Sequence, residues 1–330
     1  SRGMLHLGLF KIREGPLMVY GYGDYRYECV EHWGYEAKER WNVKETAGIT
    51  VDENDNVYLL TRTDPPVIVF DREGNVLDSF GGDIFVRAHG MFRDRDGTIY
   101  GVDDGGHAVY QFNSSKELVR TWGTKNMPSD TGCVNKDYKT IQRAAGPFNY
   151  PTRLVADKDG YVYVTDGYGN ARVHKFTHDG VLVKSWGEPG EAPGQFNLPH
   201  GIAIDNDGRL YVADRQNHRV QLFTTEGELI AVWNGFHRPS DLWIDRNGIV
   251  YVAECKRTSD WNDAPSRVSI LDRTGHLISQ LCDNGSHYDM ELGSRCAHGL
   301  CVDSNGDLYV SEVGKKLQDS FYGVRKYRRV

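Results

Sequence analysis

Three histidines, His89, His200 and His298, occupy the same position in every second unit of a chain built from six similar units. If the units form a ring, alternate units lie about 120° apart, so the three imidazoles converge on the ring axis. Three neutral imidazoles can bind a divalent metal and leave a fourth position open, which is the arrangement of catalytic rather than structural zinc sites. Iron, copper and nickel also accept histidine ligands. The pattern predicts an axial metal centre, with Zn²⁺ as the first choice.

A second set of polar residues follows an apolar strand in three of the units. Arg62 follows YLLT, Tyr168 lies two residues after YVTD, and Arg215 follows YVAD. Strand ends near the axis point toward the volume that the histidines occupy, so we expect these side chains to lie beside the metal centre. Arginine can bind a carboxylate with two hydrogen bonds, and its charge favours the phenolate form of a neighbouring tyrosine, which can then act as a base.

Each of these residues also has an ordinary structural alternative. A single histidine often hydrogen-bonds to backbone at the start of a strand. The arginines can form salt bridges with acids such as Asp214 or Asp166, and Tyr168 can pack on a neighbouring loop. The combination of all six residues around one axis favours the functional interpretation.

The repeated unit is clearest in residues 199–233. An apolar stretch at 202–204 leads through the turn Asp-Asn-Asp-Gly into a buried strand at 210–213, and two further strands follow at 219–223 and 228–233. Four short antiparallel strands form one propeller blade, so we predict an all-β, six-bladed propeller. The acid that starts each turn is expected to accept backbone hydrogen bonds and to have no catalytic role. These acids are Asp52, Asp94, Asp157, Asp205, Asp245 and Asp303.

The six copies predict a single domain over residues 1–330, with an N-terminal extension at 1–45. Blades are expected at about 46–81, 88–123, 151–187, 198–234, 239–281 and 297–330. The last copy ends after its third strand, so residues 25–34 are expected to supply the fourth strand and close the ring. Insertions at 124–146, 255–266 and 283–296 are expected to form loops on one face, around a binding site.

Composition narrows the classes of partner. The net charge is -7 and the basic residues are scattered, which argues against a nucleic-acid or anionic membrane partner. No apolar run is long enough for a membrane span. The six cysteines include no C-x-x-C pair. Cys282 and Cys296 are a candidate disulfide, although free thiols in a cytoplasmic protein are favoured. Nothing in the sequence indicates an oligomeric state.

Over nearly all of residues 46–330 the sequence resembles the NHL-repeat propellers and, among them, the peptidyl-α-hydroxyglycine α-amidating lyase family. The resemblance lies in AHGM, LPHG and AHGL around the three histidines, DGYGNAR around Tyr168, LLTRTD at Arg62 and VADRQN at Arg215. It implies a catalytic zinc on the histidines, Tyr168 as base, and the two arginines as clamps for a carboxylate. The implied reaction cleaves the C–N bond of an N-substituted α-hydroxyglycine, which gives an amide and glyoxylate.

Two departures from the family pattern change the expectations. The resemblance implies a structural calcium held by an aspartate after the third histidine and by backbone oxygens near Ile49 and Met91, but Gly299 stands at the aspartate position. This departure argues against calcium. Gly169 replaces a cysteine of the secreted animal enzymes, in agreement with a cytoplasmic chain.

No copper monooxygenase domain is attached, so we expect a small N-acyl or N-carbamoyl hydroxyglycine that carries a carboxylate rather than a peptide hormone. The competing functions are a metal-dependent hydrolase or lactonase, and a non-catalytic NHL scaffold that binds protein or RNA. The all-histidine ligand set argues against the first, and the scattered basic charge argues against RNA.

Overall fold

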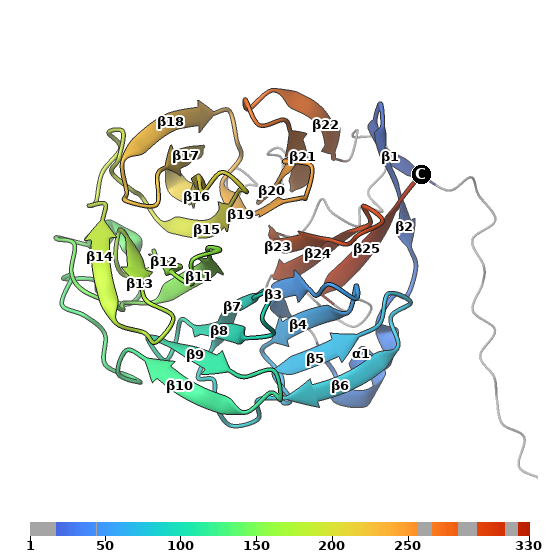
Figure 1. Ribbon diagram of the computed structural model, residues 1–330, viewed down its shortest axis with the longest axis horizontal. Coiled ribbons are helices and arrows are strands. Elements are labelled where there is room, and N and C mark those ends of the chain that lie inside the picture. Colours follow the sequence, from blue (N-terminus) through green and yellow to red (C-terminus); the bar gives the residue numbers. More distant parts are fainter. Residues whose placement is uncertain (1–17, 44, 256–265, 283–295, 314–322) are drawn as a thin grey trace, which may run out of the picture.

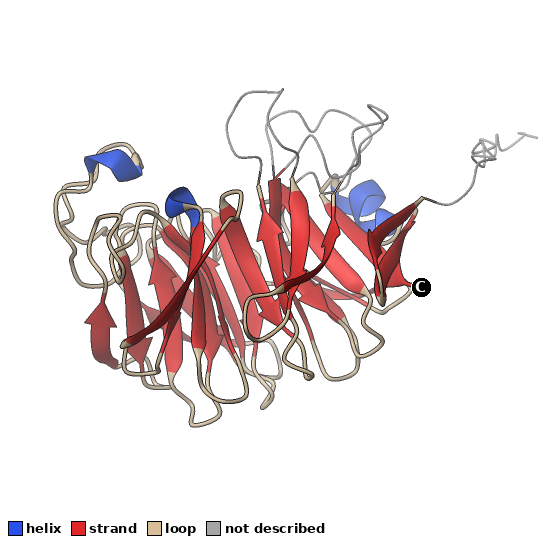
Figure 2. Ribbon diagram, turned by 90° about the horizontal axis from the view of Figure 1, so that it is seen from above, coloured by secondary structure: helices blue, strands red, loops and turns tan. Residues whose placement is uncertain are grey.

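Six antiparallel sheets surround a central axis (Figure 1), so the predicted six-bladed propeller is confirmed. The computed structural model describes residues 18–43, 45–255, 266–282, 296–313 and 323–330. In each blade the first strand lies at the axis and the fourth lies at the rim. Figure 2 shows the sheets from the side, with loops at both ends of the ring.

The first three blades each consist of four consecutive strands in simple meander order. Blade 1 contains β3 (Thr46–Val51), β4 (Val57–Thr61), β5 (Val67–Phe70) and β6 (Val76–Phe80). Blade 2 contains β7 (Ala88–Arg93), β8 (Ile99–Asp103), β9 (Ala108–Phe112) and β10 (Leu118–Trp122). Blade 3 contains β11 (Pro151–Ala156), β12 (Val162–Asp166), β13 (Arg172–Phe176) and β14 (Leu182–Trp186).

Blades 4 and 5 repeat this order, whereas blade 6 combines both ends of the chain. Blade 4 contains β15 (Pro199–Ile204), β16 (Leu210–Asp214), β17 (Arg219–Phe223) and β18 (Leu229–Asn234). Blade 5 contains β19 (Pro239–Ile244), β20 (Val250–Glu254), β21 (Arg267–Leu271) and β22 (Leu277–Leu281). Blade 6 contains β23 (Cys296–Val302), β24 (Leu308–Val313), β25 (Val324–Arg329), β2 (Tyr25–Val30) and β1 (Val19–Tyr22).

The described helices are short and lie outside the sheets. They are α1 (Tyr35–Trp41), η1 (Tyr138–Thr140) and η2 (Arg215–Asn217). None of them is long and apolar enough to cross a membrane.

The ring closes as the sequence predicts, with one addition. β2 pairs antiparallel with β25, so that Cys29 lies opposite Tyr327. The predicted closing segment 25–34 therefore supplies the fourth strand of blade 6. The preceding strand β1 pairs with β2 and adds a fifth strand at the outer edge. Pairing the two chain ends in one sheet gives β25 a partner on each side.

The Asp of each repeat has a structural role, as blade 4 illustrates. The Asp205 carboxylate accepts hydrogen bonds from the backbone N–H groups of Asp207 and Arg209, at 3.0 Å and 2.9 Å. It also accepts one from the hydroxyl of Tyr211, at 3.1 Å, and Tyr211 is fully buried. Gly208 follows in the left-handed region with a φ of 80°, where a side chain would be strained. The Asp, Gly and Tyr of the repeat thus fix one hairpin together.

The hydrophobic core lies between neighbouring blades. One cluster joins Tyr100 and Val102 of blade 2 to Leu154, Val162 and Phe176 of blade 3. Full burial of a large apolar side chain contributes about 1.5–3 kcal/mol. Because each blade packs in this way on its neighbours, the inner strands are held at fixed positions around the axis.

Candidate metal centre

The three histidines meet on the axis. His89 lies in β7, His200 in β15 and His298 in β23, and one ligand atom from each lies within 4.8 Å of the others. The sequence placed them just before the first strands, but the structure places them inside those strands, where the pairing register shifts. A bulge of this kind redirects the side chain. The predicted convergence of the imidazoles is confirmed.

Backbone hydrogen bonds orient each imidazole. The Nδ1 atoms lie 2.7 Å from a carbonyl oxygen for His89, 2.5 Å for His200 and 2.7 Å for His298. Each accepting oxygen belongs to the residue at the same repeat position in the next blade. These residues are Thr152, Ser240 and Ala47. Because Nδ1 must donate its hydrogen to a carbonyl, the lone pair of Nε2 is left for a metal. The structural alternative, a hydrogen bond to backbone, therefore concerns Nδ1, whereas the metal-ligand interpretation concerns Nε2 of the same rings.

The electrostatic surroundings keep the imidazoles neutral. Burial is the main cause that lowers the pKa of all three histidines well below 6.5. Nearby positive charge adds to the effect, from Arg215 on His200 and from Arg62 on His298. The Nε2 atom of His298 is buried and has no hydrogen-bond partner among the described residues. Since a buried polar atom without a partner is costly, this donor set fits a metal such as zinc.

Tyr168 lies between two of the imidazoles. Its hydroxyl oxygen is 3.2 Å from Nε2 of His89 and 3.0 Å from Nε2 of His200. It lies two residues beyond the end of β12, as its sequence position indicated. A Cβ on the intervening Gly167 would overlap the carbonyl oxygen of Pro199, so only glycine allows this close approach. The phenol oxygen is therefore held at the axis next to the candidate metal position.

Arg215 also points into the centre, where it follows β16. Its Nη1 donates to the Tyr168 hydroxyl at 3.3 Å, and its Nη2 to Sγ of Cys255 at 3.7 Å. The alternative salt bridge to Asp214 does not form, because that carboxylate accepts a hydrogen bond from Nε of Arg219 at 2.7 Å. The cation of Arg215 is thus directed at the phenol oxygen rather than at a carboxylate.

Arg62 lies on the other side of the triad, after β4. Its Nη1 forms a salt bridge with Glu45 at 2.6 Å, and its Nε donates to the carbonyl oxygen of Ala88 at 3.3 Å. The second acid considered as an arginine partner, Asp166, instead accepts from Nε2 of His174 at 3.2 Å. Glu45 largely neutralises Arg62, so the two arginines are not equivalent.

The insertion at 124–146 covers part of the site, as predicted. Lys136 places its ammonium 4.4 Å from the ring centroid of Tyr168 and 5.0 Å from that of Tyr150, and it forms a salt bridge with Asp104. Burial lowers the pKa of Lys136 to about 8, although Asp104 acts in the opposite direction. Sequence reasoning missed this lysine because the insertion has no counterpart in other repeats. The other two expected walls fall mainly on residues 256–265 and 283–295, which lie outside the described residues.

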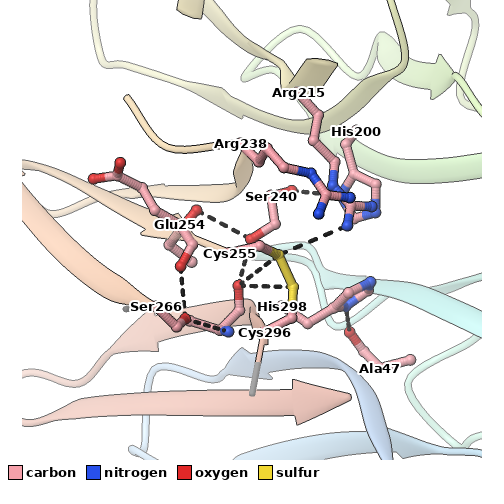
Figure 3. The surroundings of a disulfide bond; sticks show 12 residues. Ala47, His200, Arg215, Arg238, Ser240, Glu254, Cys255, Ser266, Cys296 and His298 are labelled. Carbon is pink, nitrogen blue, oxygen red and sulfur yellow. Dashed lines mark hydrogen bonds between the residues drawn. A yellow bond between two sulfur atoms is a disulfide. The ribbon is translucent and has the colours of Figure 1, made fainter. Parts of the chain in front are cut away.

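The candidate Cys282–Cys296 disulfide is wrong, and the expectation of free thiols is wrong for Cys255 and Cys296. Cys296 is bonded to Cys255, with their Cα atoms 4.3 Å apart, so the candidate pair of Cys282 with Cys296 does not form. Cys282 follows β22 at the rim of blade 5, whereas Cys296 begins β23 at the axis, so their closeness in sequence does not bring them together. Cys255 ends the inner hairpin of blade 5, beside the start of β23. The disulfide consequently lies next to the histidine triad (Figure 3).

The structure agrees with the argument against calcium, because the implied calcium position does not fit a metal ion. One residue beyond each histidine position, four of the six repeats have glycine; these are Gly48, Gly90, Gly201 and Gly299. The other two have Arg153 and Asp241, which form a buried ion pair with Nε 3.1 Å from the carboxylate oxygen. Arg153 also donates to the carbonyl oxygens of Met91 and Ile49, the oxygens implied as calcium ligands. A guanidinium therefore already occupies the position of the cation.

A cavity of about 1,100 Å³ lies at the opposite end of the axial channel, among hairpin turns such as those of Asp157 and Asp205. Arg153 forms part of its wall, and none of the three histidines does. The first strands run from the histidine end to this turn end, with the Arg153 ion pair between. The chemistry of the triad is thus directed to the other face of the ring.

Known proteins contain the same repeat, and some are similar to this chain in sequence. A family model for the NHL repeat matches residues 148–176 and 196–223. A probable peptidyl-alpha-hydroxyglycine alpha-amidating lyase of Caenorhabditis elegans is 30% identical over 259 residues, which cover 75% of this chain and 67% of that protein. The chain belongs to the peptidyl-α-hydroxyglycine α-amidating lyase family. Membership of this amidating lyase family supports a lyase-type function, and the resemblance expected from the sequence is confirmed.

Two further proteins are similar to this chain, one in sequence and one in fold. Peptidyl-glycine alpha-amidating monooxygenase A of Xenopus laevis is 32% identical over 170 residues, which cover 48% of this chain but only 16% of that protein. A gluconolactonase of Xanthomonas campestris superposes with a TM-score of 0.59 at 14% identity and covers 93% of this chain and 90% of that one. At that identity the likeness concerns the propeller fold alone.

Proposed function

We propose that this amidating lyase family member is a zinc-dependent enzyme that cleaves the C–N bond of an N-substituted α-hydroxyglycine into an amide and glyoxylate. The observation that carries the proposal is the position of Tyr168. Its hydroxyl oxygen lies within 3.2 Å of two imidazole nitrogens and 3.3 Å from an arginine Nη. A base, three metal ligands and a cation therefore share one small, partly buried volume.

Zinc held by the three imidazoles would supply a Lewis acid beside the substrate hydroxyl. The chain itself supplies the remaining groups. The substrate carboxylate is bound by guanidinium groups on the same face, because arginine matches the planar, two-oxygen geometry of a carboxylate. The insertion that carries Lys136 covers Tyr168 and limits access of water to the phenol oxygen. A small N-acyl or N-carbamoyl hydroxyglycine suits these groups.

The proposed step carries one proton from the substrate oxygen to the nitrogen and shifts two electron pairs. Tyr168, as phenolate, takes the proton of the substrate hydroxyl, and the O–H electrons form the carbonyl group of glyoxylate. The C–N bond breaks with its electron pair on nitrogen, and nitrogen receives a proton. The overall change converts R–CO–NH–CH(OH)–COO⁻ into R–CO–NH₂ and OHC–COO⁻ without a co-reactant. The cation of Arg215 beside the phenol oxygen favours the phenolate form.

The competing functions account less well for the positions of Tyr168 and His298. A lactonase needs an activated water and no phenol base, and the gluconolactonase likeness extends only to the fold. A non-catalytic scaffold does not need a buried imidazole nitrogen that lacks a partner in the described part of the chain, as His298 Nε2 does. The lyase accounts for both features.

The reaction can be tested with α-hydroxyhippurate, the benzoyl derivative of α-hydroxyglycine. We expect the zinc-loaded chain to release glyoxylate and benzamide in equal amounts, and the metal-stripped chain to release neither until zinc is restored. A δ-lactone serves as the alternative substrate. Lactone hydrolysis without glyoxylate release would replace the lyase by the hydrolase, and inactivity on both substrates at full zinc occupancy would contradict the proposed reaction.

A further inference from the structure

The positive charges around the histidine triad fall into two groups. Arg62, Arg87 and Lys136 have carboxylate partners, since Arg62 pairs with Glu45 and the other two share Asp104. Each of these three cations therefore has a close carboxylate, although Arg87 and Lys136 share a single one. Any anion that binds at the triad gains little from a charge that already has a close carboxylate.

Arg215 and Arg238 form the second group, and both have only neutral partners among the described residues. The partners of Arg215 are the Tyr168 hydroxyl and a cysteine sulfur, and its Nε has none. Nε of Arg238 donates to Oε1 of Gln216 at 3.0 Å. Figure 3 shows both guanidinium groups beside His200. Two cations thus lie together at the metal centre without a described carboxylate to balance them.

The protein holds Arg238 in this place by its backbone. Arg238 has a φ of 45°, in the left-handed region that a residue with a side chain rarely adopts. Its N–H donates to Nδ1 of His218 at 3.2 Å, and the N–H of the preceding His237 donates to the buried carboxylate of Glu254 at 2.5 Å. These bonds fix the loop before β19, so the direction of the side chain is built into the fold.

This arrangement is unfavourable without a ligand. Burial and the charge of Arg215 lower the pKa of Arg238 to about 10, so the guanidinium remains charged at neutral pH. Two like charges in a partly buried volume repel each other and lose hydration. An anion bound between them would remove both costs. A planar carboxylate can accept hydrogen bonds from both guanidinium groups.

We infer that Arg238 is a specificity-determining residue which, together with Arg215, binds the substrate carboxylate beside the histidine triad. The inference rests on the proposed function in that the carboxylate is taken to be that of an α-hydroxyglycine. Arg62 lies apart from this pair of arginines, on the other side of the triad, where it forms a salt bridge with Glu45. The substrate class is thereby limited to compounds with a free carboxylate next to the carbon that reacts.

The test uses the full zinc-loaded chain and compares Arg238→Gln with Arg87→Gln. Arg87 has the same repeat position in the opposite blade, but it forms a salt bridge with Asp104, so it is a matched control. Binding is measured by calorimetry with hippurate, which carries the carboxylate and lacks the reactive hydroxyl, and with hippuramide, which lacks the carboxylate. Loss of a charged hydrogen-bond partner is expected to weaken hippurate binding by about 30-fold in Arg238→Gln, with little change for hippuramide. Arg238→Lys is expected to recover part of the affinity.

Turnover provides the second readout. For α-hydroxyhippurate, Arg238→Gln is expected to raise KM by a similar factor and to change kcat much less, because the carboxylate is bound equally in the ground and transition states. The variant is expected to fold at least as stably as the parent in the absence of anions, since one of two repelling charges is gone. Equal losses in Arg87→Gln, or unchanged hippurate affinity in Arg238→Gln, would overturn the inference.

The two proposals can fail separately. Hippurate binding requires no reaction, so it tests Arg238 even in a chain that releases no glyoxylate. Conversely, glyoxylate release with normal hippurate affinity in Arg238→Gln would leave the lyase intact and remove Arg238 from carboxylate binding.

Discussion

Replacing Tyr168 by phenylalanine is expected to lower kcat for glyoxylate release about 10³-fold while zinc remains bound. The substitution removes only the hydroxyl, which lies 3.2 Å and 3.0 Å from two imidazole nitrogens and accepts a hydrogen bond from Arg215. Loss of a positioned general base typically costs a factor of about 10²–10⁴. The ring itself stays, so packing against the insertion is kept. Steady-state kinetics on α-hydroxyhippurate, with zinc measured on the same sample, provides the check.

The matched control is Tyr150→Phe, because Tyr150 also lies beneath the Lys136 ammonium but does not contact the histidines through its hydroxyl. This variant is expected to retain turnover within about threefold of the parent. If Tyr168→Phe keeps its zinc and its turnover, Tyr168 is not the base. If it loses zinc as well as turnover, the hydroxyl supports the metal centre rather than the proton transfer.

Replacing Arg153 by methionine is expected to lower the free energy of unfolding by about 3–5 kcal/mol, the usual cost of leaving one partner of a buried ion pair alone. Arg153 and Asp241 are 5% and 3% exposed, and the guanidinium also donates to the carbonyl oxygens of Met91 and Ile49. Urea unfolding followed by circular dichroism measures the change. Adding Asp241→Asn to Arg153→Met is expected to recover part of the loss, because the uncompensated carboxylate disappears.

Two controls isolate the contribution of the buried ion pair. Arg120 pairs with Asp179 on the surface, so Arg120→Met is expected to cost less than about 1 kcal/mol. The zinc-loaded parent protein is expected to unfold at the same urea concentration with and without added calcium, since a guanidinium occupies the cation position. Stabilisation by added calcium would show that calcium is bound after all, and a neutral Arg153→Met would show that the ion pair contributes nothing.

The positions of the three histidines could be predicted because a closed ring converts an interval of two repeats into a rotation of about 120°. Side chains at one repeat position then have to converge, whatever the loops do. The sequence does not show in the same way what orients the three imidazoles in alternate blades. Each imidazole requires a backbone carbonyl from the next blade, and that oxygen can come from Thr152, Ser240 or Ala47. A backbone acceptor leaves no signature in the residue type.

The other residues of the site differ in whether the sequence could predict them. Arg153 and Asp241 could have been predicted from the repeat position that follows the histidines, because the remaining four repeats all have glycine there. Arg238 lies two positions before the histidine column and corresponds to Arg87. Only the structure shows that Arg87 pairs with a carboxylate, whereas Arg238 has a neutral partner among the described residues. Lys136 had no signal, because an insertion has no repeat to align with.

The central claim is a single zinc ion on the histidine triad, and metal analysis of the purified chain tests it most directly. The parent is predicted to contain about one zinc per chain, since three imidazoles complete the protein part of a catalytic site. His200→Ala is predicted to lose nearly all of it, whereas His276→Ala, at an exposed position away from the axis, is predicted to keep it. A parent chain far below one zinc after incubation with zinc, or a His200→Ala variant with the zinc content of the parent, would contradict the account.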